Sequence, residues 1–389
     1  MAAGTGGPWT TRPIFITACW FLVITLTLTG LILGRDFLIP LAVALIVWYL
    51  INALARGVKR LGVGRITLPY PLCLAISALA IIGFFLIIGN TVSSNIIAVA
   101  DSAPTYERNL QQLITHTAEW LGMAEAPTVT SLIRSINLAE VVPRIASSIS
   151  GFLADAGLVL AYILFLLFEQ SVFDRKLKRF IHNPDREEQV RTVLARISKE
   201  IETYIWIKTV TSAMTAVISY AVLIMVGVDF AAFWGLVIFL LAYIPTIGSL
   251  LGILFPALLT LLQFGELEPF LLVAVPLAVA QIIIGNVVEP RMMGRSLNLS
   301  PLVVMVSLVL WSVIWGVPGA FLCVPITVIF MIVCTYVPSM RGVAVLLSND
   351  GSLETVERPA GAAARGAARP GTGPLTRPPA ADGTPTEGA

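Results

Sequence analysis

Apolar residues gather along the chain in blocks of roughly 20, a length that crosses the ~30 Å hydrocarbon core of a bilayer as an α-helix. Five blocks have the length of ordinary spans and lie at about 14–33, 37–55, 71–91, 152–168 and 207–226. A further span is expected at about 269–285. The pattern predicts an all-α polytopic membrane protein with about six full transmembrane helices.

Two longer apolar runs, 230–264 and 301–337, do not divide into ordinary spans. The first is interrupted at 244–248 by the sequence IPTIG, and the second at 316–319 by GVPG. Proline removes a backbone donor and glycine frees the backbone, so each run should break in its middle. We therefore predict two Gly/Pro-broken helical hairpins, each of which enters and leaves on one face of the membrane.

Unwound backbone inside a membrane must be buried in protein or line a wet cavity. Paired broken segments in the two halves of a membrane protein are a sequence indication of a transport site. The alternative interpretation is that the breaks are kinks that only help the helices to pack.

Two polar sections separate the spans. Section 93–150 should hold amphipathic helices, one of which is expected to begin at Ser102 and Pro104. Section 171–206 starts with basic residues and becomes an amphipathic helix that continues without a breaker into the span at 207–226. The tail from Asn349 is rich in Ala, Gly, Pro and Thr, a composition typical of disorder.

Basic residues cluster near span ends in 56–65, 171–206 and 286–300, which the positive-inside rule assigns to the cytoplasm. We expect a bacterial inner-membrane protein with both termini in the cytoplasm. The predicted division is a cytoplasmic N-terminus at 1–12, transmembrane helices at 13–92, a periplasmic section at 93–150, a fourth transmembrane helix at 151–170, a cytoplasmic section at 171–206, a transmembrane core with both hairpins at 207–340, and a disordered cytoplasmic tail at 341–389.

Composition supports this class of protein and disfavours others. Charged residues make up 12% of the chain, whereas soluble domains carry about 25%. The net charge of +2 is too small to indicate a nucleic-acid partner. The four cysteines lie in apolar blocks without metal-ligand or redox spacing, and no Walker sequence is present. We expect no enzyme activity, no cofactor and no metal site.

The densest polar cluster near a membrane edge is segment 285–296. Asn286 and Glu289 share a helix face if the preceding span continues to them, and Gln281 lies at the edge of that face. Pro290 is expected to end the helix, with Arg291 and Arg295 just beyond it. A carboxylate there, within reach of two guanidinium groups, could bind a cation, relay a proton or form a gate. A purely structural ion pair is the alternative.

The second broken run begins with Ser300 followed by Pro301, a favourable helix start. Its free N–H groups and dipole would favour an anion. The same pair is also an ordinary way to begin a helix, so both interpretations stay open.

Several motifs resemble one known family. They are NVVEPRMMGRSL at 286–297, LSPLVV at 299–304, WGVPGA at 315–320, VP at 324–325 and YIPTIGS at 243–249. Together they look like the signature of the autoinducer-2 exporter family, also described as PerM-like permeases. The span layout is similar over about 10–345, whereas the tail lies outside the family pattern.

The resemblance implies a membrane transporter. Members are linked to export of a furanone-type quorum signal and others to sodium or lithium/proton antiport, so the solute stays open. The resemblance also implies a homo-oligomer, with a pentamer as one option. The candidate pathway or gate residues are Pro245, Thr246, Gly248, Gln281, Asn286, Glu289, Pro290, Arg291, Gly294, Arg295, Pro301, Gly316, Pro318 and Gly319.

Three hypotheses follow. The first is a secondary transporter that exports a small polar solute or a signalling molecule of autoinducer-2 type. The second is a sodium(lithium)/proton antiporter, which needs a carboxylate accessible from both sides; Asp229, Glu266 and Glu268 are placed outside and Glu289 at the inner edge. The third is a non-transporting membrane scaffold. The expected partners are a small-molecule or ion substrate and membrane lipid, without nucleic acid.

Overall fold

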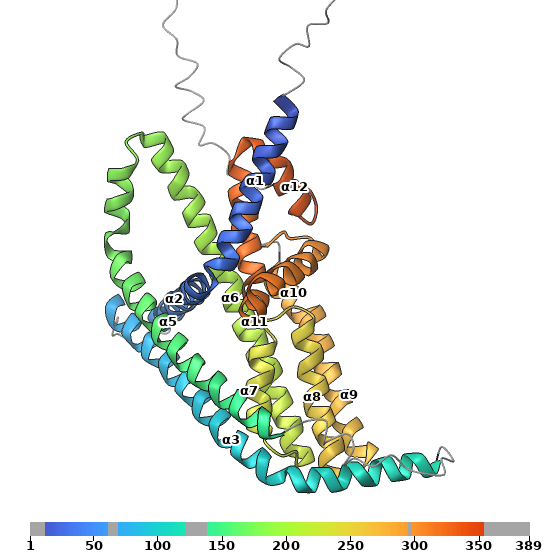
Figure 1. The fold of residues 1–389 in the computed structure, drawn as a ribbon. Helices are drawn as coiled ribbons and strands as arrows, with labels where there is room; N and C mark the ends of the chain where they lie inside the picture. Colours follow the sequence, from blue (N-terminus) through green and yellow to red (C-terminus); the bar gives the residue numbers. More distant parts are fainter. Residues whose placement is uncertain (1–11, 61–68, 121–137, 295–296, 354–389) are drawn as a thin grey trace, which may run out of the picture.

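The computed structural model describes residues 12–60, 69–120, 138–294 and 297–353, and within them the chain is helical (Figure 1). In these residues eight helices are long and apolar enough to cross a membrane. The prediction of an all-α polytopic membrane protein is confirmed. The predicted N-terminus at 1–12 lies almost wholly outside the described residues, as does most of the predicted tail. The prediction of disorder from residue 341 is wrong at its start, because Arg341–Leu347 form a helix in which Ala344 packs on Met331 and Cys334.

The first half of the chain forms long helices. These are α1 (Arg12–Leu33), α2 (Arg35–Arg60), α3 (Tyr70–Trp120), α5 (Leu138–Phe180) and α6 (Pro184–Val226). The second half contains shorter elements. These are α7 (Ala231–Leu241), α8 (Ile247–Phe264), α9 (Leu267–Ile283), a π-helical segment η1 (Ile284–Val288), α10 (Glu289–Met293), α11 (Pro301–Tyr336), a 3₁₀ turn η2 (Pro338–Met340) and α12 (Arg341–Leu347).

The predicted helix start at Ser102 and Pro104 is wrong, because α3 stays helical through both residues. A proline inside a helix costs about 3 kcal/mol, but packing can hold the helix on both sides of it. Here α3 packs against α2 near its start and against α8 near its end. The side-chain amide of Asn109 donates to the carbonyls of Leu262 and Gln263, at 3.1 and 2.6 Å, which fixes the extended end of α3.

The prediction that the second amphipathic helix runs unbroken into its span is confirmed by α6, which is 43 residues long. Asn183 caps its start, since the side-chain oxygen accepts from the backbone N–H groups of Asp185 and Arg186. Gly227 ends it in the left-handed region, with φ 80°. The helix therefore links a hydrophilic turn outside the apolar body to its interior.

The first long apolar run breaks as predicted, because α7 ends at Leu241 and α8 begins at Ile247. Thr246, at the tip, has φ 61° and ψ −55°. Gly248 is required by the tight return, since a Cβ there would lie 1.7 Å from the carbonyl oxygen of Leu241. The two arms pack against each other as a hairpin.

The second run also folds back on itself. Gly316 has φ 65° and ψ −140°, values that interrupt α11 between two helical arms. Across the arms, the Ser307 hydroxyl donates to the carbonyl of Cys323 at 3.0 Å. A Cβ on Gly319 would lie 1.9 Å from the carbonyl oxygen of Trp311. The second predicted hairpin is thus confirmed.

The hairpins enter from opposite ends of the molecule (Figure 1). The base of α7 and α8 lies beside the extended end of α3, whereas the base of α11 packs on α12 through Met331, Cys334 and Ala344. They meet inside, where the ring of Tyr243 stacks on Phe321 with centroids 6.1 Å apart.

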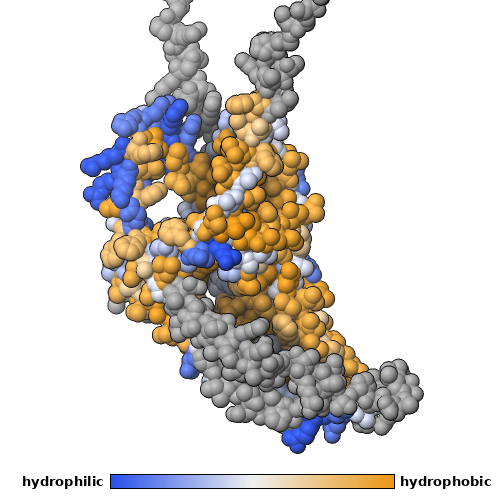
Figure 2. All heavy atoms as spheres, viewed as in Figure 1, coloured by the Kyte–Doolittle hydropathy of each residue, from blue (hydrophilic) through white to orange (hydrophobic). Residues whose placement is uncertain are grey.

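Hydrophobic side chains cover much of the visible surface, and hydrophilic ones gather at the α5–α6 turn and around the extended end of α3 (Figure 2). Burial is uneven between helices. In the most apolar window of α11, 61% of residues are buried, compared with none in α1. The core of the molecule therefore lies around α11 and α6, and α1 lies on the outside.

Candidate functional site

A cavity of about 360 Å³ lies where α6, the tip of the first hairpin and the α9–η1–α10 helix meet. Its lining is rich in polar groups, although it is built from elements of the apolar core. The lining residues are Lys208, Thr211, Ser212, Thr215, Ala242, Ile244, Pro245, Thr246, Ser249, Gln281, Ile282, Ile284, Gly285, Asn286 and Glu289.

An ion pair joins two walls of the cavity. The ammonium of Lys208 lies 2.6 Å from a carboxylate oxygen of Glu289, and the side chains are only 9% and 20% exposed. The ammonium also donates to the carbonyl of Ala242 at 3.4 Å, at the C-terminal end of α7. A helix C-terminus carries partial negative charge and favours a cation. Each buried charge therefore has a counter-charge, which burial requires.

The prediction that Pro290 ends the helix is wrong, because α10 continues through it to Met293. The ring of a helical proline clashes with the carbonyl four residues earlier, here that of Asn286. The π-helical segment η1 surrounds this carbonyl, and the N–H of Glu289 bonds to the carbonyl of Ile284, five residues back. The wider turn lets the helix pass the proline. Insertions of this kind are frequent at functional sites.

The predicted partners of Glu289 were Arg291 and Arg295, but the structure pairs it with Lys208. Arg291 is exposed, two residues beyond Glu289, and no ion pair links the two in the described part of the chain. Arg295 lies outside the described residues. The π-helical segment explains the change, because it turns Glu289 toward α6, against which η1 and α10 pack.

The tip of the first hairpin is held in an unusual conformation. A positive φ is rare for a β-branched residue and costs of order 1–3 kcal/mol, so Thr246 is strained. Its carbonyl accepts a hydrogen bond of 2.7 Å from the hydroxyl of Ser249. Such strain clusters at binding and switch sites, and here it borders the cavity.

A polar stripe on α6 forms the wall opposite the hairpin, and our sequence prediction missed it. We define the α6 stripe as Lys208, Thr211, Ser212, Thr215 and Ser219, whose relative exposures range from 1% to 7%. The spacing of three and four residues places them on one helix face. This spacing, inside a run otherwise long enough to span a membrane, is the signal that could have identified them.

The other predicted site residues divide into groups. Pro245, Thr246, Gln281, Asn286 and Glu289 line the cavity, and Gly248 lines a narrow extension of it. Gly294 ends α10 with φ 55°, and Pro301 is the first residue of α11. Gly316, Pro318 and Gly319 form the second hairpin and do not line the cavity.

The helix start at Ser300 has its own partner. Ser300 occupies the N-cap position of α11, but its side chain makes no capping hydrogen bond. Its backbone N–H donates to the carbonyl of Leu347 at 3.0 Å. The anion site considered from the sequence stays untested. Within the described residues, no group of three or more His, Cys, Asp and Glu side chains is placed to hold a metal ion.

Long apolar helices, two hairpins from opposite ends and a charged pair in a polar cavity define a polytopic membrane permease. The model of the AI-2E family transporters matches residues 21–339, so the chain belongs to this family. The resemblance drawn from the sequence motifs is thereby confirmed.

Curated relatives extend over most of the chain. The AI-2 transport protein TqsA of Escherichia coli (strain K12) is 27% identical over 331 residues, which cover 84% of this chain and 94% of the relative. The putative transport protein YhhT of the same strain is 27% identical over 305 residues, with 77% and 84% covered. A sodium-lithium/proton antiporter of Halobacillus andaensis is 26% identical over 202 residues, with 52% and 55% covered.

Proposed function

We propose that this chain is a secondary transporter that exports a small polar solute of autoinducer-2 type through the cavity at Lys208 and Glu289. The observation that carries the proposal is the buried ion pair beside a broken hairpin inside a polar cavity. Charged residues inside a membrane protein are costly, and those that occur mark substrate or ion pathways. The name of the relative TqsA supports the autoinducer-2 class of solute.

The proposed setting is the bacterial inner membrane, with both termini in the cytoplasm. Lipid would surround the apolar surface, and the functional form would be a homo-oligomer, of which a pentamer is one form to be tested. Native mass spectrometry of the detergent-solubilised protein gives the number of subunits.

Flux into and out of proteoliposomes tests the proposal. Liposomes that contain the purified protein should release preloaded autoinducer-2 faster than protein-free liposomes. A proton gradient should change the release rate if transport is coupled to protons. Glu289→Gln changes the cavity and should lower the flux. Its matched control is Glu268→Gln, because Glu268 is an exposed acid on α9 that does not line the cavity. If proteoliposomes released every solute and ion in a panel no faster than protein-free liposomes, the result would support the scaffold hypothesis instead.

A sodium(lithium)/proton antiporter is the second candidate, and the carboxylate of Glu289 favours it. This carboxylate lines the cavity and lies near the carbonyl-rich end of α7, and hard cations prefer oxygen ligands of these kinds. A relative bears this function in its name. Addition of Na⁺ or Li⁺ to proteoliposomes that contain a pH-sensitive dye would then change the internal pH, without any organic solute.

A further inference from the structure

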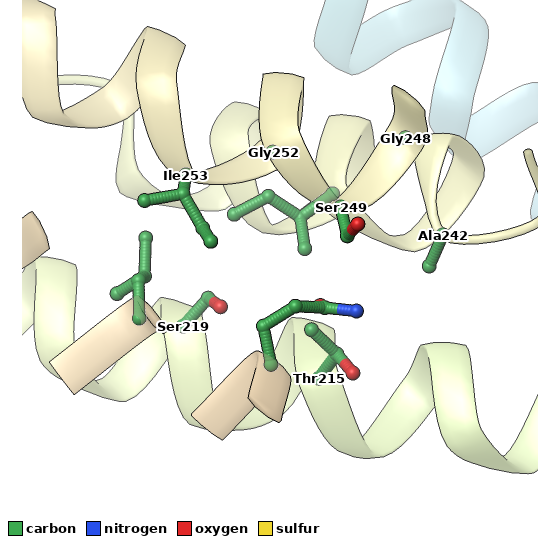
Figure 3. A pocket seen from close by; sticks show the side chains of 10 residues that line it. Thr215, Ser219, Ala242, Gly248, Ser249, Gly252 and Ile253 are labelled. Atoms are coloured by element: carbon green, nitrogen blue, oxygen red, sulfur yellow. The ribbon is translucent and has the colours of Figure 1, made fainter. Parts of the chain in front are cut away.

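The cavity continues past the ion pair along α6. A second gap, of only about 10 Å³, is lined by Thr215, Ser249, Gln281 and Ala242, which also line the large cavity. It reaches onward to Ser219 of the α6 stripe. In Figure 3, Thr215 and Ser219 lie on one side of this gap and Ser249 and Ile253 on the other. The two spaces are therefore neighbouring parts of one polar route along α6.

Hydroxyl groups along this route have unused hydrogen-bonding capacity. Thr211 and Thr215 donate to carbonyls of their own helix, of Ile207 and Thr211, both at 3.0 Å, so their oxygens remain acceptors. Ser212 lines the cavity, is 1% exposed, and its hydroxyl has no hydrogen-bond partner among the described residues. A buried hydroxyl without a partner is rare and needs an explanation. A polar solute or water that moves along α6 supplies one.

The far end of the route is closed by apolar side chains. Ile238 of α7, Ile253 of α8 and Leu277 of α9 line the narrow gap, and Ile238 and Leu277 are 3% and 2% exposed. Gly252 of α8 lies against Ile238 across the hairpin, since a Cβ on it would meet the Ile238 side chain at an ordinary contact distance of 3.6 Å. A gap that holds no more than about one water cannot pass a larger solute.

The near end is wider and more exposed. Asn286, which lines the large cavity, is exposed, whereas Ser219, which lines the narrow gap, is 2% exposed. Asn286 belongs to the segment that the positive-inside rule assigns to the cytoplasm. The route is therefore open on the predicted cytoplasmic side and closed on the side of the base of α7 and α8.

We propose that the transport route runs along the α6 stripe, and that Ile238, Ile253 and Leu277 form its gate, closed in this conformation. The inference rests on the proposed transport function and names the residues that determine passage. Opening requires the α8 arm to move away from α6 and α9, and the strained tip at Thr246 is the place where that arm begins.

Thiol labelling in membrane vesicles tests the gate without any knowledge of the solute. The background is Cys19→Ala, since Cys73, Cys323 and Cys334 are buried. With a membrane-impermeant, positively charged methanethiosulfonate reagent, Asn286→Cys should react from the predicted cytoplasmic side. Ser219→Cys should react at least ~10-fold more slowly from that side, because a small increase in the activation free energy of labelling lowers the rate tenfold. Adding Ile253→Ala to Ser219→Cys should remove most of this protection.

Ile238→Ala is a second way to open the gate if Ile253→Ala reduces the amount of folded protein. Leu254→Ala is the matched control, because Leu254 follows Ile253 on α8 but is 41% exposed on the outer surface. Fast labelling of Ser219→Cys with the gate intact would overturn the proposal. Unchanged protection in both gate variants, with folded protein verified by gel filtration, would also overturn it. Either labelling result would overturn the gate without bearing on whether the protein transports a solute. Conversely, the expected labelling together with no flux in proteoliposomes would overturn the transport function.

Discussion

Lys208 and Glu289 come from segments far apart in the sequence and meet inside the apolar body at 2.6 Å. Removing one member of a buried pair leaves the other charge without compensation, which costs about 3–5 kcal/mol, whereas replacing both can be nearly neutral. This asymmetry separates a structural role for the pair from a role in transport.

We expect Glu289→Gln to lower both flux and thermal stability in detergent, because the ammonium of Lys208 loses its counter-charge. The double variant Lys208→Met, Glu289→Leu should recover stability but not flux. Thermal unfolding and proteoliposome flux measure the two effects. Glu169→Gln is the control, since it breaks an exposed pair with Lys176 and should change stability by no more than about 1 kcal/mol. Normal flux in the double variant would show that the pair is only structural.

Gly248 and Gly319 are two positions where a single methyl group should matter. A Cβ at either would lie within 2 Å of a backbone oxygen, 1.7 Å for Gly248 and 1.9 Å for Gly319. Gly248→Ala and Gly319→Ala should therefore lower the unfolding temperature and the flux. Gly83→Ala in α3 meets nothing within 4 Å and should hold or raise stability, because Ala favours helix by up to about 1 kcal/mol. Equal stability in all three variants would contradict the tight returns seen in both hairpins.

At the scale of elements, the two broken hairpins and the π-helical segment determine the shape of the site. Each hairpin places unwound backbone within the apolar body, and the first one supplies Pro245, Thr246 and Ser249 to the cavity. The second supports the first, since Ile244 packs with Ala320 and Val324.

The proline in each break gives a test at this scale. Pro245→Ala and Pro318→Ala restore a backbone N–H and free φ at each return, while the packed arms keep the hairpins folded, so stability in detergent should change little. Flux should fall most for Pro245→Ala, because only this proline lines the cavity. The comparison of the two variants, measured by flux and thermal unfolding, is internally controlled. A stable Pro245→Ala variant with unchanged flux would mean that the break serves packing alone.

The breaks were predictable from sequence because they depend on local chemistry: Pro245, Gly248, Gly316 and Gly319 act on their own backbone. The ion pair was not, because Lys208 stands at the edge of an apolar run, where a lysine resembles a positive-inside anchor. From the sequence, Glu289 is expected to pair with the nearby arginines, since the sequence does not show how α6 and α10 align with each other. The π-helical segment, which carries the helix past Pro290, depends on packing against α6 and has no local signature.

At the scale of the whole molecule, the two hairpins enter from opposite ends and α6 runs the length between them (Figure 1). Arg186 lies near the start of α6, and Glu266 lies in the short connection from α8 to α9. Both are exposed. The basic residues near Arg186 predict that this end faces the cytoplasm.

Single-cysteine labelling checks this orientation. In the Cys19→Ala background, Arg186→Cys should react with an impermeant thiol reagent in inverted vesicles, and Glu266→Cys in right-side-out vesicles. Labelling of both positions from the same side would contradict the predicted topology. The labelled fraction can be read directly by mass spectrometry.

The most direct test of the central claim blocks the cavity itself. Ser249 lines both parts of the route and is partly buried, so Ser249→Cys in the Cys19→Ala background places a thiol inside it. Autoinducer-2 flux is measured before and after complete modification with a bulky thiol reagent, and Lys176→Cys, outside the cavity, is the matched control. The structure predicts loss of flux in Ser249→Cys alone. Full modification of Ser249→Cys with undiminished flux would show that the solute takes another path.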